Sequence, residues 1–216
     1  MRPRIVFYLG RTLEEVAPPV LNERGIGGSE TAVIEIARRF AEDGWGVDVF
    51  TSAGRYEGEY GGVGFWEPGR LGTNERADVL VSWRKPDAHG LPISARARLL
   101  WCHDHNGGPA WAPFLPLWDR VLGVSAYHRD FLADAYALPP DKVGYVPNGI
   151  DLTRFDPTIR KIPGRCVYAS SPDRGLVTLL KMWPEIIGSE TAPELHVCYG
   201  FHNIDKWIES GRNDLA

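Results

Sequence analysis

The sequence predicts an α/β fold, in which a parallel β-sheet with helices on both faces is followed by the start of a second unit of the same kind. Short runs of β-branched and aromatic residues alternate with segments of helical periodicity. The strand-like runs are apolar almost without interruption, which is typical of parallel sheets buried on both faces. After a stretch without periodicity at 152–164, which contains Pro157 and Pro163, the same alternation begins again.

The first part of the chain contains six strong strand signals and two helical ones. The strands are expected at residues 4–9, 47–52, 77–83, 97–104, 120–125 and 142–151, with a shorter strand at 63–66 inside a glycine-rich loop. The helices are expected at 29–44 and across 126–138. Apolar residues recur at helical spacing in the first helix, with Ser29 as its expected N-cap and Gly44 as its stop.

The restart of the pattern predicts two domains, at 1–155 and 156–216. The second contains a strand at 166–171, a helix at 174–187, a strand at 194–200 and the start of another helix. Two strands and fewer than two full helices bury too little surface for an independent domain. We therefore expect this unit to be incomplete. Part of the apolar face of the helix at 174–187 should then be exposed, or covered in a homodimer.

Composition narrows the function classes. The 216 residues are 44% hydrophobic and 24% charged with a net charge of −4, and no basic stripe points to a nucleic-acid partner. The apolar run before Gly10 is too short for a signal segment or a membrane span, so we expect neither, and a cytoplasmic location. Cys102, Cys166 and Cys198 lie in strand-like runs, and we expect them to be buried core residues of a reducing compartment.

The stretch RGIGGSETA, residues 24–32, places three glycines directly before a predicted helix. A dinucleotide fingerprint would need G-x-G-x-x-G immediately after the first strand, so an NAD cofactor is not expected. The main-chain amides of Gly27 and Gly28, together with Ser29, could face a phosphate at the helix N-terminus. A tight turn into the helix explains the glycines equally well.

The stretch WCHDHNGG, residues 101–108, ends the fourth strong strand, at the sheet edge where ligands of open α/β folds bind. His103, Asp104 and His105 cluster there, and the indoles of Trp111 and Trp118 could stack on sugar rings. The histidines fit a polar substrate contact or a structural role. A metal site is not expected, because no third ligand is evident.

Two further stretches join elements of the predicted fold. SSPDRGL, residues 170–176, leads into the helix at 174–187, and Arg174 is expected in its first turn. A cation there opposes the helix dipole, which favours a ligand role such as diphosphate binding, with a surface arginine as the alternative. VPNGID, residues 146–151, contains the turn signal Asn148–Gly149.

In this order, GIGGSET, WCHD, VPNGID and YASSPDRGL resemble the GT-B glycosyltransferases of the retaining family-4 type, over nearly the whole chain. The resemblance implies two Rossmann-like domains facing across a cleft, the first for the acceptor and the second for the nucleotide-sugar donor. It implies transfer of a hexose from a nucleotide-diphosphate sugar to a glycan or lipid-linked acceptor, with retention, in surface polysaccharide biosynthesis. No metal or cofactor beyond the nucleotide sugar is implied.

The resemblance also assigns roles to single residues. The donor diphosphate would be approached by Gly27, Gly28, Ser29, Ser171 and Arg174. The transferred sugar would lie beside His103 and Asp104. The acceptor side of the cleft would be lined by His105, Trp111, Asn148 and Gly149. The family usually has a second basic residue in the diphosphate clamp, where this chain has Ser170 or Ser171.

The family places a Glu-x7-Glu pair later in its second domain, and Ala216 is reached before any such segment. We therefore expect a truncated or naturally short product whose transfer activity alone is weak or nil. The alternative from another class is a non-catalytic carbohydrate- or partner-binding module derived from the same fold. A nucleotide-binding oxidoreductase is disfavoured by the long first loop.

Overall fold

The computed structural model describes residues 2–104, 107–188, 193–198, 200–209 and 211. Contacts divide the chain into two compact units, Met1–Ile150 and Asp151–Ala216, which we call unit 1 and unit 2. The division falls a few residues before the domain boundary that the sequence predicts at 155.

Unit 1 is built on an eight-stranded sheet with the order β3-β4-β2-β1-β5-β6-β7-β8. The strands are β1 Arg4–Gly10, β2 Gly46–Thr51, β3 Gly58–Tyr60, β4 Val63–Trp66, β5 Glu75–Trp83, β6 Ile93–Trp101, β7 Arg120–Gly123 and β8 Val143–Tyr145. Neighbouring strands are parallel, except that β3 pairs antiparallel with β4 at one edge. The predicted α/β class with a parallel sheet is confirmed, and its topology is compatible with a Rossmann-like fold.

The central strand β1 shows why the sheet needs cover on both faces. Ile5, Phe7 and Leu9 pack in one hydrophobic cluster, whereas Val6 packs in the other. Successive side chains of a strand point to opposite faces, so a nearly continuous apolar run supplies both cores. This explains why the strands lack the alternating pattern of a sheet with one wet face.

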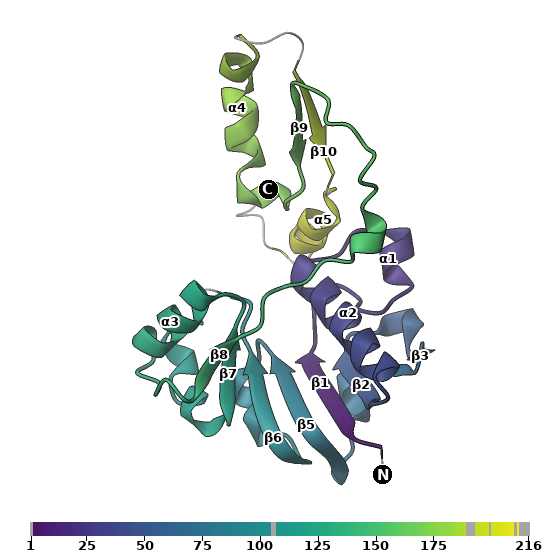
Figure 1. Ribbon diagram of the computed structural model, residues 1–216, viewed down its shortest axis with the longest axis vertical. Coiled ribbons are helices and arrows are strands. Elements are labelled where there is room, and N and C mark those ends of the chain that lie inside the picture. The colour runs from purple at the N-terminus through teal and green to yellow at the C-terminus, as the bar shows by residue number, and fades with distance from the viewer. Residues whose placement is uncertain (1, 105–106, 189–192, 199, 210, 212–216) are drawn as a thin grey trace. The chain divides into compact units, whose positions relative to one another are not determined.

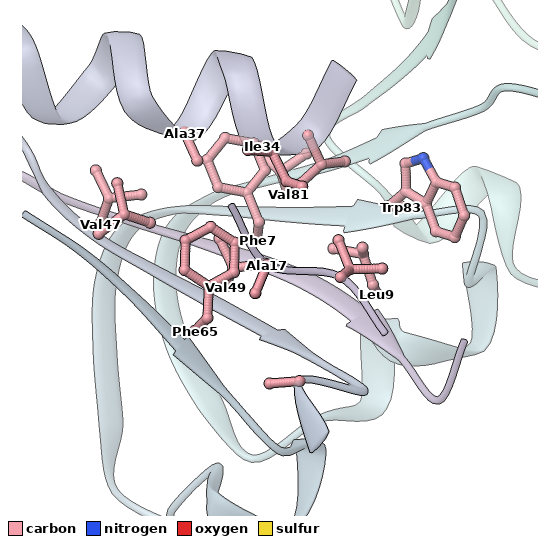
Figure 2. Packing of buried hydrophobic residues seen from close by; sticks show 14 of the residues in the cluster. Phe7, Leu9, Ala17, Ile34, Ala37, Val47, Val49, Phe65, Val81 and Trp83 are labelled. Carbon is pink, nitrogen blue, oxygen red and sulfur yellow. The ribbon is translucent and has the colours of Figure 1, made fainter. Parts of the chain in front are cut away.

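Helix α2, Gly28–Glu42, covers the part of one face formed by β1 and β2, as Figure 1 shows. Figure 2 shows Ile34 and Ala37 of this helix over Phe7 and Val49 of the sheet. The N-cap is Gly27, which has no side chain to cap with, so the prediction of Ser29 as N-cap is wrong.

Two shorter helices belong to unit 1. Helix α1, Val20–Glu23, lies in the long first loop and was not predicted. Helix α3, Ala126–Ala135, packs beside β7 and β8 (Figure 1), and its N-cap Ser125 accepts a hydrogen bond from the His128 amide. Leu132 of this helix contributes to the second hydrophobic cluster. The two clusters therefore lie on the two faces of the sheet.

Unit 2 has two parallel strands, β9 Arg165–Tyr168 and β10 Glu194–Val197, and two helices, α4 Leu176–Ile187 and α5 His202–Glu209. The predicted order of elements is confirmed. Arg174, however, does not lie in the first turn of the helix. It ends a short 3-10 turn, and Gly175 with φ +105° separates it from α4. The argument from the helix dipole for a ligand role of Arg174 is therefore wrong.

Much apolar surface of unit 2 is exposed. Leu180, Ile186 and Ile187 are exposed, as we expected for part of the apolar face of α4, whereas Leu176 of that face is buried. Val177 and Met182 of α4 are more than half exposed as well. Cys166 and Cys198 are exposed as well, so only Cys102 fits the prediction of buried cysteines. The two-stranded sheet explains the error, because a strand run is buried only when layers cover both of its faces.

Candidate functional site at the carboxyl edge of unit 1

The glycine turn before α2 is already occupied by carboxylates of unit 1. The Gly27 amide donates a hydrogen bond to Glu14 Oε2 at 2.9 Å. A Cβ placed on Gly27 would lie 2.1 Å from Glu30 Oε2, so the Glu30 side chain folds over this glycine. The expectation that the Gly27 amide faces a diphosphate is therefore wrong. Gly28 differs, since a Cβ there would meet nothing within 4 Å.

Glu14 acts as the capping group that Ser29 was expected to be. Glu14 lies in the long first loop, yet it is only 4% exposed. It accepts the hydrogen bond of an amide that lies thirteen residues further along the chain. A carboxylate at a helix N-terminus gains from the unpaired amides and from the helix dipole. The Ser29 hydroxyl instead donates to Glu30 Oε2 at 3.3 Å.

Glu30 brings a second carboxyl group to the same turn. Burial raises its pKa most strongly, and the nearby charge of Glu14 raises it further. The positive charge of Arg84 acts in the opposite direction, which places Arg84 within electrostatic reach of the turn. The first loop, the start of α2 and the end of β5 therefore meet at one edge of the sheet.

His103 lies just past the end of β6, which stops at Trp101 and not at 104 as predicted. Its ring packs edge-on against Trp101, with ring centroids 4.4 Å apart, and lies 6.1 Å from the Trp83 ring. Burial, and next the charges of Arg84 and His128, lower the pKa of His103 to about 4. The imidazole is therefore neutral at pH 7, with one nitrogen that donates and one that accepts.

Several polar atoms around His103 are buried without a protein partner among the residues that the structure describes. They are His103 Nε2, Trp83 Nε1, Trp101 Nε1 and Arg84 Nε. Both indoles are only 4% exposed. A buried donor or acceptor left unpaired costs about 1–3 kcal/mol, so such atoms in a native structure point to a bound polar group.

Arg84 was not singled out from the sequence, although it directly follows β5 at the same edge. Its guanidinium forms an ion pair with Asp104 and lies 4.6 Å from the centroid of the Trp83 ring. Its backbone has φ +59°, a conformation that residues other than glycine rarely adopt. The signal in the sequence that could have identified Arg84 was a cation directly after a buried strand. No sequence pattern indicates its positive φ angle.

The tryptophans expected near the acceptor are mostly packing residues. Trp118 is fully buried and its indole donates to the Pro86 carbonyl oxygen, so it is not available to stack on a sugar. Trp111 is half-buried, and its ring lies against Gly107 so closely that a Cβ on that glycine would be 1.9 Å away. His105 lies outside the described residues.

The remaining predicted residues lie near the end of unit 1 and in unit 2. Asn148 and Gly149 are exposed and belong to no helix or strand. In unit 2, the Ser171 hydroxyl bonds to Asp173, its carbonyl oxygen accepts from the Tyr168 hydroxyl at 2.8 Å, and Arg174 is exposed. The joint action of Gly28, Ser29 and Arg174 on one diphosphate concerns different units and stays a prediction.

Among the described residues, no three His, Cys, Asp or Glu side chains gather as a metal-binding group. In the same part of the chain, no helix has the length and apolar character needed to span a bilayer. No protein-family model matches the chain, and comparison with curated proteins finds no significant match. The carboxyl edge of unit 1 is therefore interpreted from its own chemistry.

The polar groups at the carboxyl edge of unit 1 suit a neutral, hydroxyl-rich ligand better than an anion. The edge carries the carboxyl groups of Glu14, Glu30 and Asp104 together with the guanidinium of Arg84. The neutral His103 ring and the buried indole N–H groups add uncharged hydrogen-bonding atoms. Carboxylates accept hydrogen bonds from hydroxyl groups, whereas they repel phosphate.

Proposed function

We propose that the chain belongs to a nucleotide-sugar-dependent glycosyltransferase that moves a hexose to a glycan or lipid-linked acceptor. The ordered motifs noted in the sequence and the parallel sheet with a polar carboxyl edge support this proposal. In this proposal the segment after β6, which carries His103 and Asp104, contacts the sugar. The observation that carries it is the neutral His103, whose buried Nε2 has no partner among the described residues and which lies beside Arg84.

The proposed role of His103 is to hydrogen-bond a sugar hydroxyl, with Asp104 as a neighbouring acceptor. An uncharged imidazole suits this role because it both donates and accepts. Since the Asp104 side chain is 44% exposed while paired with Arg84, it has room to accept a hydroxyl bond. The half-buried Trp111 remains the candidate apolar ring for a sugar face.

The proposed role of Arg174, with Ser171, is to bind the donor diphosphate from unit 2. A guanidinium stabilises the negative charge that develops on a departing diphosphate. Gly28 and Ser29 remain candidates for a contact from the start of α2, because the space at Gly28 is open. No part of this proposal requires a metal ion.

The test is a binding titration of the 216-residue chain with UDP-glucose, GDP-mannose, a neutral oligosaccharide such as maltotetraose, and NADH. We expect thermal stabilisation by one nucleotide sugar, lost in Arg174→Ala and kept in Arg160→Ala, which removes another exposed cation of unit 2. Stabilisation by NADH, or a nucleotide response that Arg174→Ala leaves unchanged, would contradict the proposal.

A carbohydrate-binding module is the second candidate, and the occupied glycine turn favours it. Because the Gly27 amide already donates to Glu14, unit 1 has fewer free main-chain amides for binding an anion than the glycines suggested. Stabilisation by oligosaccharide in the absence of any nucleotide response would identify this function. Loss of that stabilisation in His103→Asn would place the sugar at the carboxyl edge of unit 1.

A further inference from the structure

Arg84 has a backbone conformation that its surroundings must hold in place. Among the described residues other than glycine, only Arg84 and Ala137 have positive φ. Ala137 follows the C-terminus of α3, where the left-handed conformation is common. Arg84 instead follows a strand, and its amide donates to the Trp101 carbonyl oxygen at 3.1 Å, which ties the end of β5 to the end of β6. Strained residues of this kind concentrate at functional sites.

The side chain of Arg84 is fixed from two sides. Its guanidinium lies over the Trp83 ring and pairs with Asp104. The side chain is 23% exposed, and its Nε is buried without a partner among the described residues. With this backbone conformation the guanidinium lies against the segment that carries His103 and Asp104.

Charged and titratable groups from at least four elements or loops gather around this edge. Glu14 comes from the first loop, Glu30 from α2, Asp104 from the segment after β6 and His128 from α3. Arg84 acts on Glu30 and on His103, and pairs directly with Asp104. It is the cation that links the glycine turn to the His103 segment.

We propose that Arg84 is the positioning residue of this edge: its guanidinium anchors the Asp104 carboxylate and sets the orientation and electrostatic environment of His103. The inference rests on the proposed function only for the nature of the ligand. A guanidinium suits the task because it pairs with a carboxylate and stacks on an indole at once, which an ammonium group does less well.

The experiment compares Arg84→Asn, Arg84→Gly and Arg84→Lys with Arg96→Gln in the full chain. Asparagine and glycine tolerate positive φ, so they remove the guanidinium without adding backbone strain. Arg96 lies nearer the start of β6 and is 85% exposed, so its loss changes the net charge equally but far from His103. The readouts are the His103 pKa by NMR titration and the affinity for maltotetraose.

We expect the His103 pKa to rise from about 4 toward 6.5 in Arg84→Asn and Arg84→Gly, without reaching it, because burial is the larger cause of the lowered value. Arg84→Lys should keep the His103 pKa low but weaken sugar binding about tenfold, since it keeps the charge and loses the paired geometry. Arg96→Gln should change neither quantity.

An unchanged His103 pKa in both Arg84→Asn and Arg84→Gly would overturn the inference, as would full sugar affinity in Arg84→Lys. If the wild-type chain binds no saccharide while the His103 pKa shifts as expected, the proposed function fails and the positioning role of Arg84 stands. If either neutral variant does not fold, the other supplies the titration. If neither folds, the guanidinium is needed for the fold itself, and the proposal of a positioning role is overturned.

Discussion

At the scale of single residues, the main finding is that Glu14 takes the place predicted for a phosphate. Its carboxylate accepts from the Gly27 amide although it lies in another segment of the chain. No local pattern reports such a contact, because it depends on how the first loop folds back. Gly27 was a sound signal for close approach, but not for what approaches, whereas nothing lies within 4 Å of a Cβ placed on Gly28.

We predict that Glu14→Ala lowers the free energy of unfolding of unit 1 by about 1–3 kcal/mol, because the Gly27 amide loses its partner in a nearly buried place. Chemical denaturation measures the change. The control is Glu42→Ala, which removes a carboxylate in exposed ion pairs with Arg38 and Arg39 and should change stability little. Equal effects of the two variants would contradict the capping role.

We predict that His103 makes the protein less stable as the pH falls from about 6.5 toward 4. Its pKa is lowered from 6.5 to about 4 in the folded protein, so the unfolded chain binds the proton more readily in that window. The difference corresponds to about 3 kcal/mol at most.

Denaturation curves at pH 7 and pH 4.5 for the wild type and His103→Asn measure this contribution. The drop in stability on acidification should be smaller in His103→Asn than in the wild type. Equal drops in wild type and His103→Asn would show that His103 is accessible and freely protonated.

At the scale of elements, sequence periodicity predicted most helices and strands because each is driven by its own apolar residues. β1 is apolar after Arg4, β5 ends in the buried run Leu80–Trp83, and α2 has its buried residues at helical spacing. The short antiparallel β3 and the one-turn α1 escaped prediction because they carry too few residues for a period. The predicted start of α4 was two residues too early, which put Arg174 in the first helical turn. This error was enough to invalidate the argument that the helix dipole disfavours a cation there.

Helix α4 exposes apolar residues that water solvates poorly. We predict that the chain self-associates at high concentration through this helix, and that Leu180→Glu weakens the association about tenfold or more. Sedimentation velocity over a range of concentrations measures it. Lys181→Glu, at the neighbouring exposed position, is the matched control. A monomer at all concentrations, or equal effects of both variants, would contradict the prediction.

At the scale of the whole molecule, the sequence predicted the α/β class and the restart of the pattern after the first sheet, because both follow from the order of elements. The chemistry of the site was predicted less well. His103 and Asp104 were singled out as candidates from their place after a strand, whereas Arg84 and Glu14 become candidates only when separate strands and loops meet. Tertiary contacts of this kind decide whether a glycine turn attracts an anion or is already filled by a carboxylate.

The most direct test of a sugar-binding edge is a ¹H–¹⁵N NMR titration of the chain with maltotetraose, and separately with pyrophosphate. We predict that the saccharide shifts the signals of Arg84, His103 and Asp104 at the carboxyl edge of unit 1, while pyrophosphate leaves the Gly27 amide unmoved. Shifts of Gly27 with pyrophosphate, or no saccharide response at Arg84 and His103, would contradict the assignment of this edge to a neutral sugar.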